Sequence, residues 1–132
     1  MAVEPDQLRS CSLFTGLGHE ELEPLCDWFE VASVSESVTV AGEGAPGYSF
    51  FVIAQGNAVV SADGDELATL GPGDFFGEVA ILGGGRRSAT VTTTSPATLL
   101  VMFGTEFRRL QEAQPEVAAR LEATMTDRLA ER

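Results

Sequence analysis

Positive charge is scarce in this sequence. Eight of its 132 residues are Lys or Arg and 20 are Asp or Glu, so the formal net charge is -12. Nucleic acids and acidic membrane surfaces are bound through clustered positive charge, and a chain with this net negative charge would repel them. We therefore expect no nucleic acid partner and no direct membrane insertion.

Metal-binding residue types are equally rare. The chain has one histidine, His19, and two cysteines, Cys11 and Cys26. A metal-dependent β-barrel enzyme of the cupin type needs about two histidines and a carboxylate for its site, which makes that class the less favoured alternative. Helical spacing puts both cysteines near apolar positions, so we expect small buried hydrophobes, with a disulfide or redox pair as the alternative.

Long apolar runs are absent as well. The longest uncharged ones, residues 50–54 and 99–103, are far shorter than the roughly 20 residues that span a bilayer. Residues 1–6 carry acids where a signal peptide has a basic region, and no apolar stretch with a small-residue cleavage site follows. These features predict a cytoplasmic protein.

Three stretches of different hydrophobic period make up the chain. Apolar residues recur at helical spacing from about residue 5 to 30 and from about 104 to 132, where Pro115 is placed to begin the last helix. Between them, about residues 31–103 contain short β-forming runs separated by turns. This order predicts one α+β domain over residues 1–132, an antiparallel, jelly-roll-like β-roll with N-terminal and C-terminal helices.

Two tight turns are predicted within the strand region. Residues 63–65 (Asp-Gly-Asp) are a hairpin signal between two β-forming runs, and residues 55–57 (Gln-Gly-Asn) turn the chain after an apolar run. Glycine suits such positions because it tolerates a left-handed backbone.

The segment with the most chemical information is residues 71–91, Gly-Pro-Gly-Asp-Phe-Phe-Gly-Glu-Val-Ala-Ile-Leu-Gly-Gly-Gly-Arg-Arg-Ser-Ala-Thr-Val. It closely resembles the phosphate-binding cassette of the cyclic nucleotide-binding domain family, in which Phe-Gly-Glu and an apolar run precede an arginine followed by a small residue, Ala, Thr and Val. Further positions that match the family extend over nearly the whole chain. The resemblance implies a β-roll that carries a short cassette helix and binds a cyclic nucleotide, cAMP, with cGMP possible. The ligand-binding residues that it implies are Phe76, Gly77, Glu78, Val79, Ala80, Arg87, Ser88, Ala89, Val91 and Arg128.

Each part of a cyclic nucleotide needs its own type of partner. Arg87 offers a planar fork of donors to two phosphate oxygens, and Glu78 can accept a hydrogen bond from the ribose hydroxyl. Gly77 lets the backbone approach the ligand, while one helical turn at residues 78–82 can point free N–H groups at the anion. Ser88 can add its hydroxyl. Without the surrounding pattern, Glu78 and Arg87 would be interpreted as a surface ion pair.

Arg128 is singled out by its place in the last helix. Its distance from Pro115 resembles the arrangement in bacterial cyclic nucleotide-gated potassium channel domains, where an arginine of the last helix caps the purine. The alternative is a helix that only packs, through an apolar stripe at Val117, Leu121, Met125 and Leu129. The stripe is punctuated by small and polar residues, so we expect modest burial and opening at low cost. The resemblance implies that this helix closes over the purine when the ligand binds and that its movement signals to the effector.

The departures from the family pattern are few. Ser35 and Glu36 stand where the family usually has a glycine before the strand at residues 38–40, and residues 83–85 are a triple glycine. The absent glycine should affect only a turn. The triple glycine should make the loop before Arg87 more mobile, which bears on the affinity for the ligand. The resemblance therefore implies a regulatory domain rather than an enzyme, with an effector that the sequence does not name. A degenerate family member acting only as an interaction domain is the remaining alternative.

Overall fold

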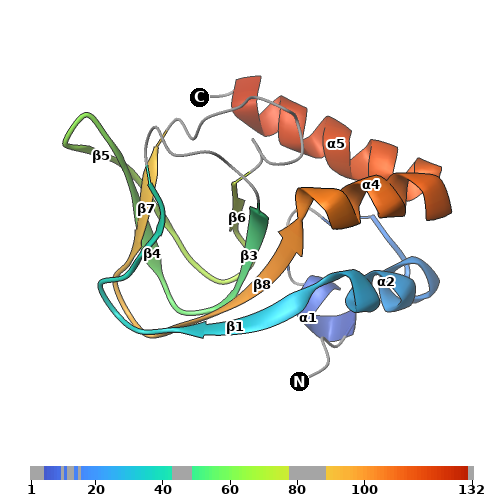
Figure 1. The fold of residues 1–132 in the computed structure, drawn as a ribbon, viewed down its shortest axis with the longest axis horizontal. Coiled ribbons are helices and arrows are strands. Elements are labelled where there is room, and N and C mark those ends of the chain that lie inside the picture. Colours follow the sequence, from blue (N-terminus) through green and yellow to red (C-terminus); the bar gives the residue numbers. More distant parts are fainter. Residues whose placement is uncertain are drawn as a thin grey trace.

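Strands gather at one end of the molecule and helices at the other (Figure 1). The computed structural model describes residues 5–9, 11, 14, 16–42, 49–77 and 89–130, of which residues 128–130 are described by their backbone alone. The helices are α1 (Pro5–Arg9), α2 (His19–Leu25), η2 (Cys26–Trp28), α4 (Gly104–Ala113) and α5 (Pro115–Ala130). The helical turn expected at residues 78–82 lies outside the described residues.

The strands form two four-stranded antiparallel sheets, in the orders β1-β8-β3-β6 and β2-β7-β4-β5. Their bounds are β1 (Glu30–Val34), β2 (Thr39–Ala41), β3 (Ser49–Gln55), β4 (Ala58–Ala62), β5 (Asp65–Leu70), β6 (Phe75–Phe76), β7 (Thr90–Thr93) and β8 (Ala97–Phe103). The α+β class and the antiparallel β-roll are thereby confirmed.

The first sheet, β1-β8-β3-β6, is the middle layer, and its strands β3 and β6 are buried on both faces. Alternate residues of β3 belong to different clusters because strand side chains point to opposite faces. Phe50 and Val52 lie in a cluster with the helices, and Phe51 and Ile53 lie in a second cluster between the sheets. Burial on both faces explains why β3 is a continuous apolar run.

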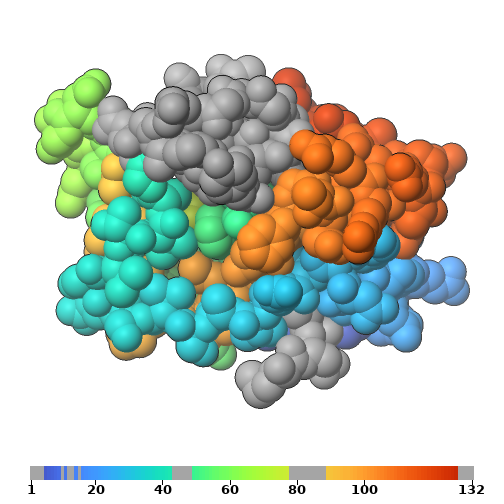
Figure 2. Space-filling model, viewed as in Figure 1, coloured from blue at the N-terminus to red at the C-terminus, as the bar shows by residue number. Residues whose placement is uncertain are grey.

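The predicted hairpin is confirmed between β4 and β5, where Ala62 pairs with Asp65. Asp63 and Gly64 have φ values of 53° and 83°, as a two-residue hairpin loop requires. The first five residues of β5 are exposed. Figure 2 shows this hairpin, in light green, projecting from the body of the molecule.

Both cysteines pack against the cluster that joins the helices to the middle sheet. Cys11 is buried, as expected, whereas Cys26 is only half-buried, and its thiol lies 3.5 Å from the carbonyl oxygen of Leu22. Both are thiols rather than disulfide partners. Among the helices that the structure describes, none is both long and apolar enough to cross a bilayer.

The turn between β1 and β2 is organised by Thr93 of β7. The Thr93 hydroxyl donates to the carbonyl oxygen of Ser35 at 2.7 Å and accepts from the Val38 amide at 2.8 Å. Thr93 is 2% exposed, and Ser37 in this turn has a left-handed φ of 65°. Ser35 and Glu36, which stand where the family usually has a glycine, thus lie at a turn that side-chain hydrogen bonds hold.

Replacing Thr93 by valine is expected to lower the free energy of unfolding by about 1 to 3 kcal/mol. Valine keeps the volume but leaves the Val38 amide without its acceptor and the Ser35 carbonyl without its donor. Urea unfolding with an unchanged m-value measures the loss. Thr92→Val, on the half-exposed face of the same strand, is the matched control, and an equal loss in both variants would contradict the role of Thr93.

Candidate functional site

The structure describes the two ends of the predicted binding segment, residues 71–77 and 89–91. Phe76, Gly77, Ala89 and Val91 are therefore placed. Outside the described part of the chain lie Glu78, Val79, Ala80, Arg87 and Ser88, together with the side chain of Arg128, whose backbone is in α5.

A braced turn leads into the segment. The Asp74 amide donates to the Gly71 carbonyl at 3.0 Å, and the Asp74 carboxylate accepts from the Gly71 amide at 2.8 Å. The turn is tied to β3, since Gly73 donates to the Ile53 carbonyl and Ile53 donates to the Asp74 carbonyl, both at 2.9 Å. The chain thus reaches β6 in a fixed direction.

The two phenylalanines of β6 point to opposite faces of the middle sheet. Phe75 belongs to the cluster beneath the helices, and Phe76 belongs to the cluster between the sheets. The Phe76 ring is 3% exposed and stacks on Phe51, with centroids 4.9 Å apart. In this structure the Phe76 side chain is engaged in core packing.

Gly77 follows with φ of 87°, in the left-handed region that glycine tolerates best. A side chain at this position would strain the backbone directly after β6, which gives Gly77 a structural role beside the predicted ligand contact.

The exit of the segment is held by β7. Val91 pairs with Ala41 of β2 and with Val60 of β4, so it lies in the middle of the second sheet. Val91 is 4% exposed and shares the cluster between the sheets with Phe76, and Ala89 packs against that cluster. One core therefore anchors both ends of the segment that contains Glu78 and Arg87.

Electrostatics single out the same segment. Arg86 and Arg87 are the only arginines or lysines between Arg9 and Arg108, and thirteen acidic residues lie in the same interval. The sequence of the β-roll therefore concentrates its positive charge at Arg86 and Arg87. Within the described ranges, no three His, Cys, Asp or Glu side chains come together as a metal site.

The last helix is buried more deeply than its composition suggested. Val117, Ala118, Leu121 and Met125 are 6%, 1%, 2% and 0% exposed and pack in one cluster with the N-terminal helices and α4. The packing stripe is thus present through Met125, and the expectation of modest burial is wrong for these side chains. The small Ala118 permits close packing rather than loosening the helix.

Sequence reasoning assigned no role to Arg120 of α5. Its Nη1 atom lies 3.4 Å from Oε2 of Glu21 in α2, 99 residues away in the chain. No local pattern connects residues so distant. For Glu21, the sequence offers one local clue. It lies three residues after Gly18, a spacing typical of the acidic residue that caps the start of a helix.

Comparison with known proteins finds one family. The model of the cyclic nucleotide-binding domain matches residues 32–114. The chain is 32% identical over 116 residues to a cyclic nucleotide-gated potassium channel of Rhizobium etli, covering 88% of this chain and 32% of the channel. It is 30% identical over 129 residues to the cyclic AMP receptor protein of Thermus thermophilus, covering 94% of this chain and 60% of the receptor.

Solved structures with a similar fold include a cAMP-bound protein. The solved structure of cAMP-bound PfPKA-R superposes with a TM-score of 0.84 at 25% identity, covering 96% of this chain and 43% of that one. The present chain spans less than two thirds of each of these three relatives. The family model covers most of the β-roll and α4, including both described ends of residues 71–91. This chain therefore belongs to the cyclic nucleotide-binding domain family.

Proposed function

We propose that this domain senses cAMP and regulates an effector. The observation that carries the proposal is the segment at residues 71–91, whose two ends are anchored in one core through Phe76 and Val91. Such anchoring holds a binding loop on a rigid scaffold, which lowers the entropic cost of ordering it around a ligand. The interval between the anchors contains the acid and the arginines that a cyclic nucleotide requires.

In this proposal each site residue has a separate task. Arg87 binds two phosphate oxygens through its guanidinium fork, and Glu78 accepts a hydrogen bond from the ribose hydroxyl. The backbone N–H groups near Val79 and Ala80 point at the phosphate from a helical turn. Ser88 adds its hydroxyl next to Arg87.

The proposed ligand is cAMP rather than cGMP. Family members that select guanine tend to carry threonine after the cassette arginine, whereas this chain has Ser88. Two relatives support the assignment, since one is named a cyclic AMP receptor protein and another was solved with cAMP bound. A serine hydroxyl can still reach a base, so cGMP is the competitor to test.

The proposed output is regulation of another protein or domain in the cytoplasm, without catalysis. Two relatives are named a cyclic nucleotide-gated potassium channel and a cyclic AMP receptor protein, and the matched part is only a portion of each. We therefore place the effector in a partner chain or in a region outside these residues.

Isothermal titration calorimetry with cAMP and cGMP tests the proposal directly. We expect stoichiometric binding of cAMP and weaker binding of cGMP. Equal or tighter binding of cGMP would contradict the proposed preference for cAMP. If the folded protein bound neither nucleotide, the degenerate interaction domain would replace this proposal.

Ligand binding is further expected to slow hydrogen exchange in α5. We propose that Arg128 stacks on the purine, which gives the helix a contact made only in the bound state. Because Leu121 and Met125 are already buried, the change should be largest after Met125, at the end of the helix. Mass-spectrometric exchange of residues 115–130 with and without saturating cAMP checks this. Identical exchange in both states would leave α5 a packing helix alone.

A further inference from the structure

One ion pair joins the C-terminal helix to the N-terminal helices. Nη1 of Arg120 in α5 lies 3.4 Å from Oε2 of Glu21 in α2, with the two side chains 51% and 41% exposed. Of the ion pairs in the described part of the chain, this is the one whose partners are far apart in sequence. It therefore connects elements rather than neighbouring turns of one helix.

Glu21 is held in place by a second contact. Its Oε1 atom accepts a hydrogen bond from the Gly18 amide at 3.1 Å, at the start of α2. The two oxygens of one carboxylate thus cap α2 and face Arg120. A carboxylate fixed in this way loses little further freedom on pairing, which favours the ion pair.

Gly16 leaves room for the arginine. A Cβ atom placed on Gly16 would lie 3.1 Å from Nη2 of Arg120, and Gly16 has φ of 89°. The guanidinium therefore lies over a residue without a side chain and reaches Glu21 from there. The same elements also meet in the core, where Leu17 and Leu22 share one cluster with Leu121 of α5.

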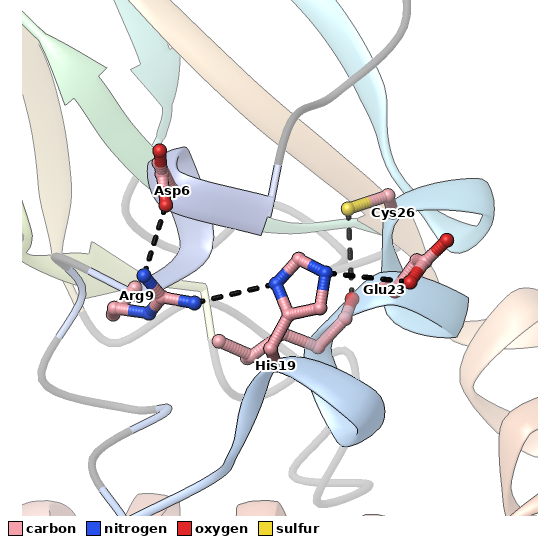
Figure 3. A network of polar contacts seen from close by, with 6 residues as sticks. Asp6, Arg9, His19, Glu23 and Cys26 are labelled. Atoms are coloured by element: carbon pink, nitrogen blue, oxygen red, sulfur yellow. Dashed lines mark hydrogen bonds and ion pairs between the residues drawn. The ribbon is translucent and has the colours of Figure 1, made fainter.

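The N-terminal helices are themselves tied together by polar contacts (Figure 3). Arg9 of α1 pairs with Asp6 at 3.0 Å, and its Nη2 atom lies 3.4 Å from Nδ1 of His19. Nε2 of His19 lies 3.4 Å from Oε2 of Glu23, one turn further along α2. Contacts therefore run from α1 through α2 to α5.

We propose that Arg120 is a positioning residue, whose pair with Glu21 sets how tightly α5 stays docked on the N-terminal helices. A change at the N-terminal helices would then alter the position of α5. Only the effect on ligand affinity rests on the proposed function, because docking is measurable without any nucleotide.

Hydrogen exchange of α5 in the absence of nucleotide is the test. Glu21→Gln removes the charge, but glutamine still caps the helix at this position. We expect exchange of residues 115–127 to become about 1.4- to 5-fold faster, the range for a partly exposed ion pair. Arg120→Gln should accelerate exchange by a similar factor, and Arg120→Lys, which keeps the charge, should accelerate it less. In the double variant Glu21→Gln/Arg120→Gln, exchange should be no faster than in either single variant.

Arg109→Gln is the matched control. Arg109 pairs with Glu106 at 3.5 Å within α4, so its loss removes an ion pair but no link to α2. Unchanged α5 exchange in Glu21→Gln, or an equal acceleration in Arg109→Gln, would overturn the proposal. High salt should shrink the difference between Glu21→Gln and the starting protein, since exposed pairs are screened.

A cAMP titration separates this inference from the proposed function. If the starting protein binds cAMP, Glu21→Gln and Arg120→Gln should weaken binding by less than the factor found for docking, because affinity falls only as the fraction of protein with α5 docked falls. Faster exchange with unaltered affinity would refute the link to the ligand. A starting protein that bound no cAMP would refute the proposed function, while the docking result would stand.

Discussion

Replacing Arg87 by alanine is expected to weaken cAMP binding about 10- to 150-fold, which corresponds to about 1.5 to 3 kcal/mol. In the proposed site this change removes a charge-assisted pair of hydrogen bonds to phosphate, and the chain has no lysine to substitute, so we expect a large loss. Calorimetry on the folded variant measures the change. Arg87→Lys should recover part of the affinity, since it restores the charge without the planar fork.

Arg86→Ala is the control that the sequence itself offers. It removes the same charge from the neighbouring residue, so it tests whether phosphate recognition depends on position or on net charge alone. We expect a smaller loss of affinity than in Arg87→Ala. Unchanged affinity in a folded Arg87→Ala protein would remove Arg87 from the phosphate site, and equal losses in the two variants would assign the effect to charge alone.

Replacing Gly56 by alanine is expected to lower the free energy of unfolding by about 2 to 4 kcal/mol. Gly56 has φ of 92° in the turn between β3 and β4. A Cβ atom there would lie 2.5 Å from the Pro96 carbonyl oxygen and 2.7 Å from the Ala97 Cα atom. Both are backbone atoms, so relief requires moving the start of β8, the central partner of β1 and β3.

Gly64→Ala separates the clash from the backbone strain. Gly64 has a similar φ of 83°, but a Cβ atom placed there would have no neighbouring atom within 4 Å. We expect this change to cost only about 1 kcal/mol, which is the strain of the left-handed conformation. Urea unfolding of both variants at equal m-values gives the comparison. An equal decrease in the free energy of unfolding in both variants would show that the backbone at Pro96 and Ala97 moves aside at little cost, contrary to the prediction.

Local patterns predicted the elements well. Pro115 begins α5, and residues 63–65 form the hairpin between β4 and β5. These features depend on residues a few positions apart, through proline geometry and the left-handed conformations open to glycine and aspartate. The composition of the last helix was a poor guide to its burial, because burial depends on what packs against a helix. Met125 is 0% exposed in a cluster that draws its residues from both ends of the chain.

In the candidate site, too, some features could be predicted from local sequence and others depended on the packing of distant strands. Glu78 and Arg87 were found from a contiguous motif, and their roles remain proposals. That Phe76 and Val91 share one core could not be read from the motif, because it depends on β6 pairing with β3 and on β7 pairing with β2 and β4. Pairing between distant strands is decided by register and packing rather than by neighbours.

The sequence by itself determined the types and order of the elements, the hairpin turn, the excess of acid and the motif that carries the family. Each is a property of composition or of residues close together in the chain. The tertiary structure decided which strands pair, the contacts of Thr93 with the turn before β2, and the ion pair between Glu21 and Arg120. These contacts join residues 55 and 99 positions apart, and only the packed core brings such positions within hydrogen-bonding distance.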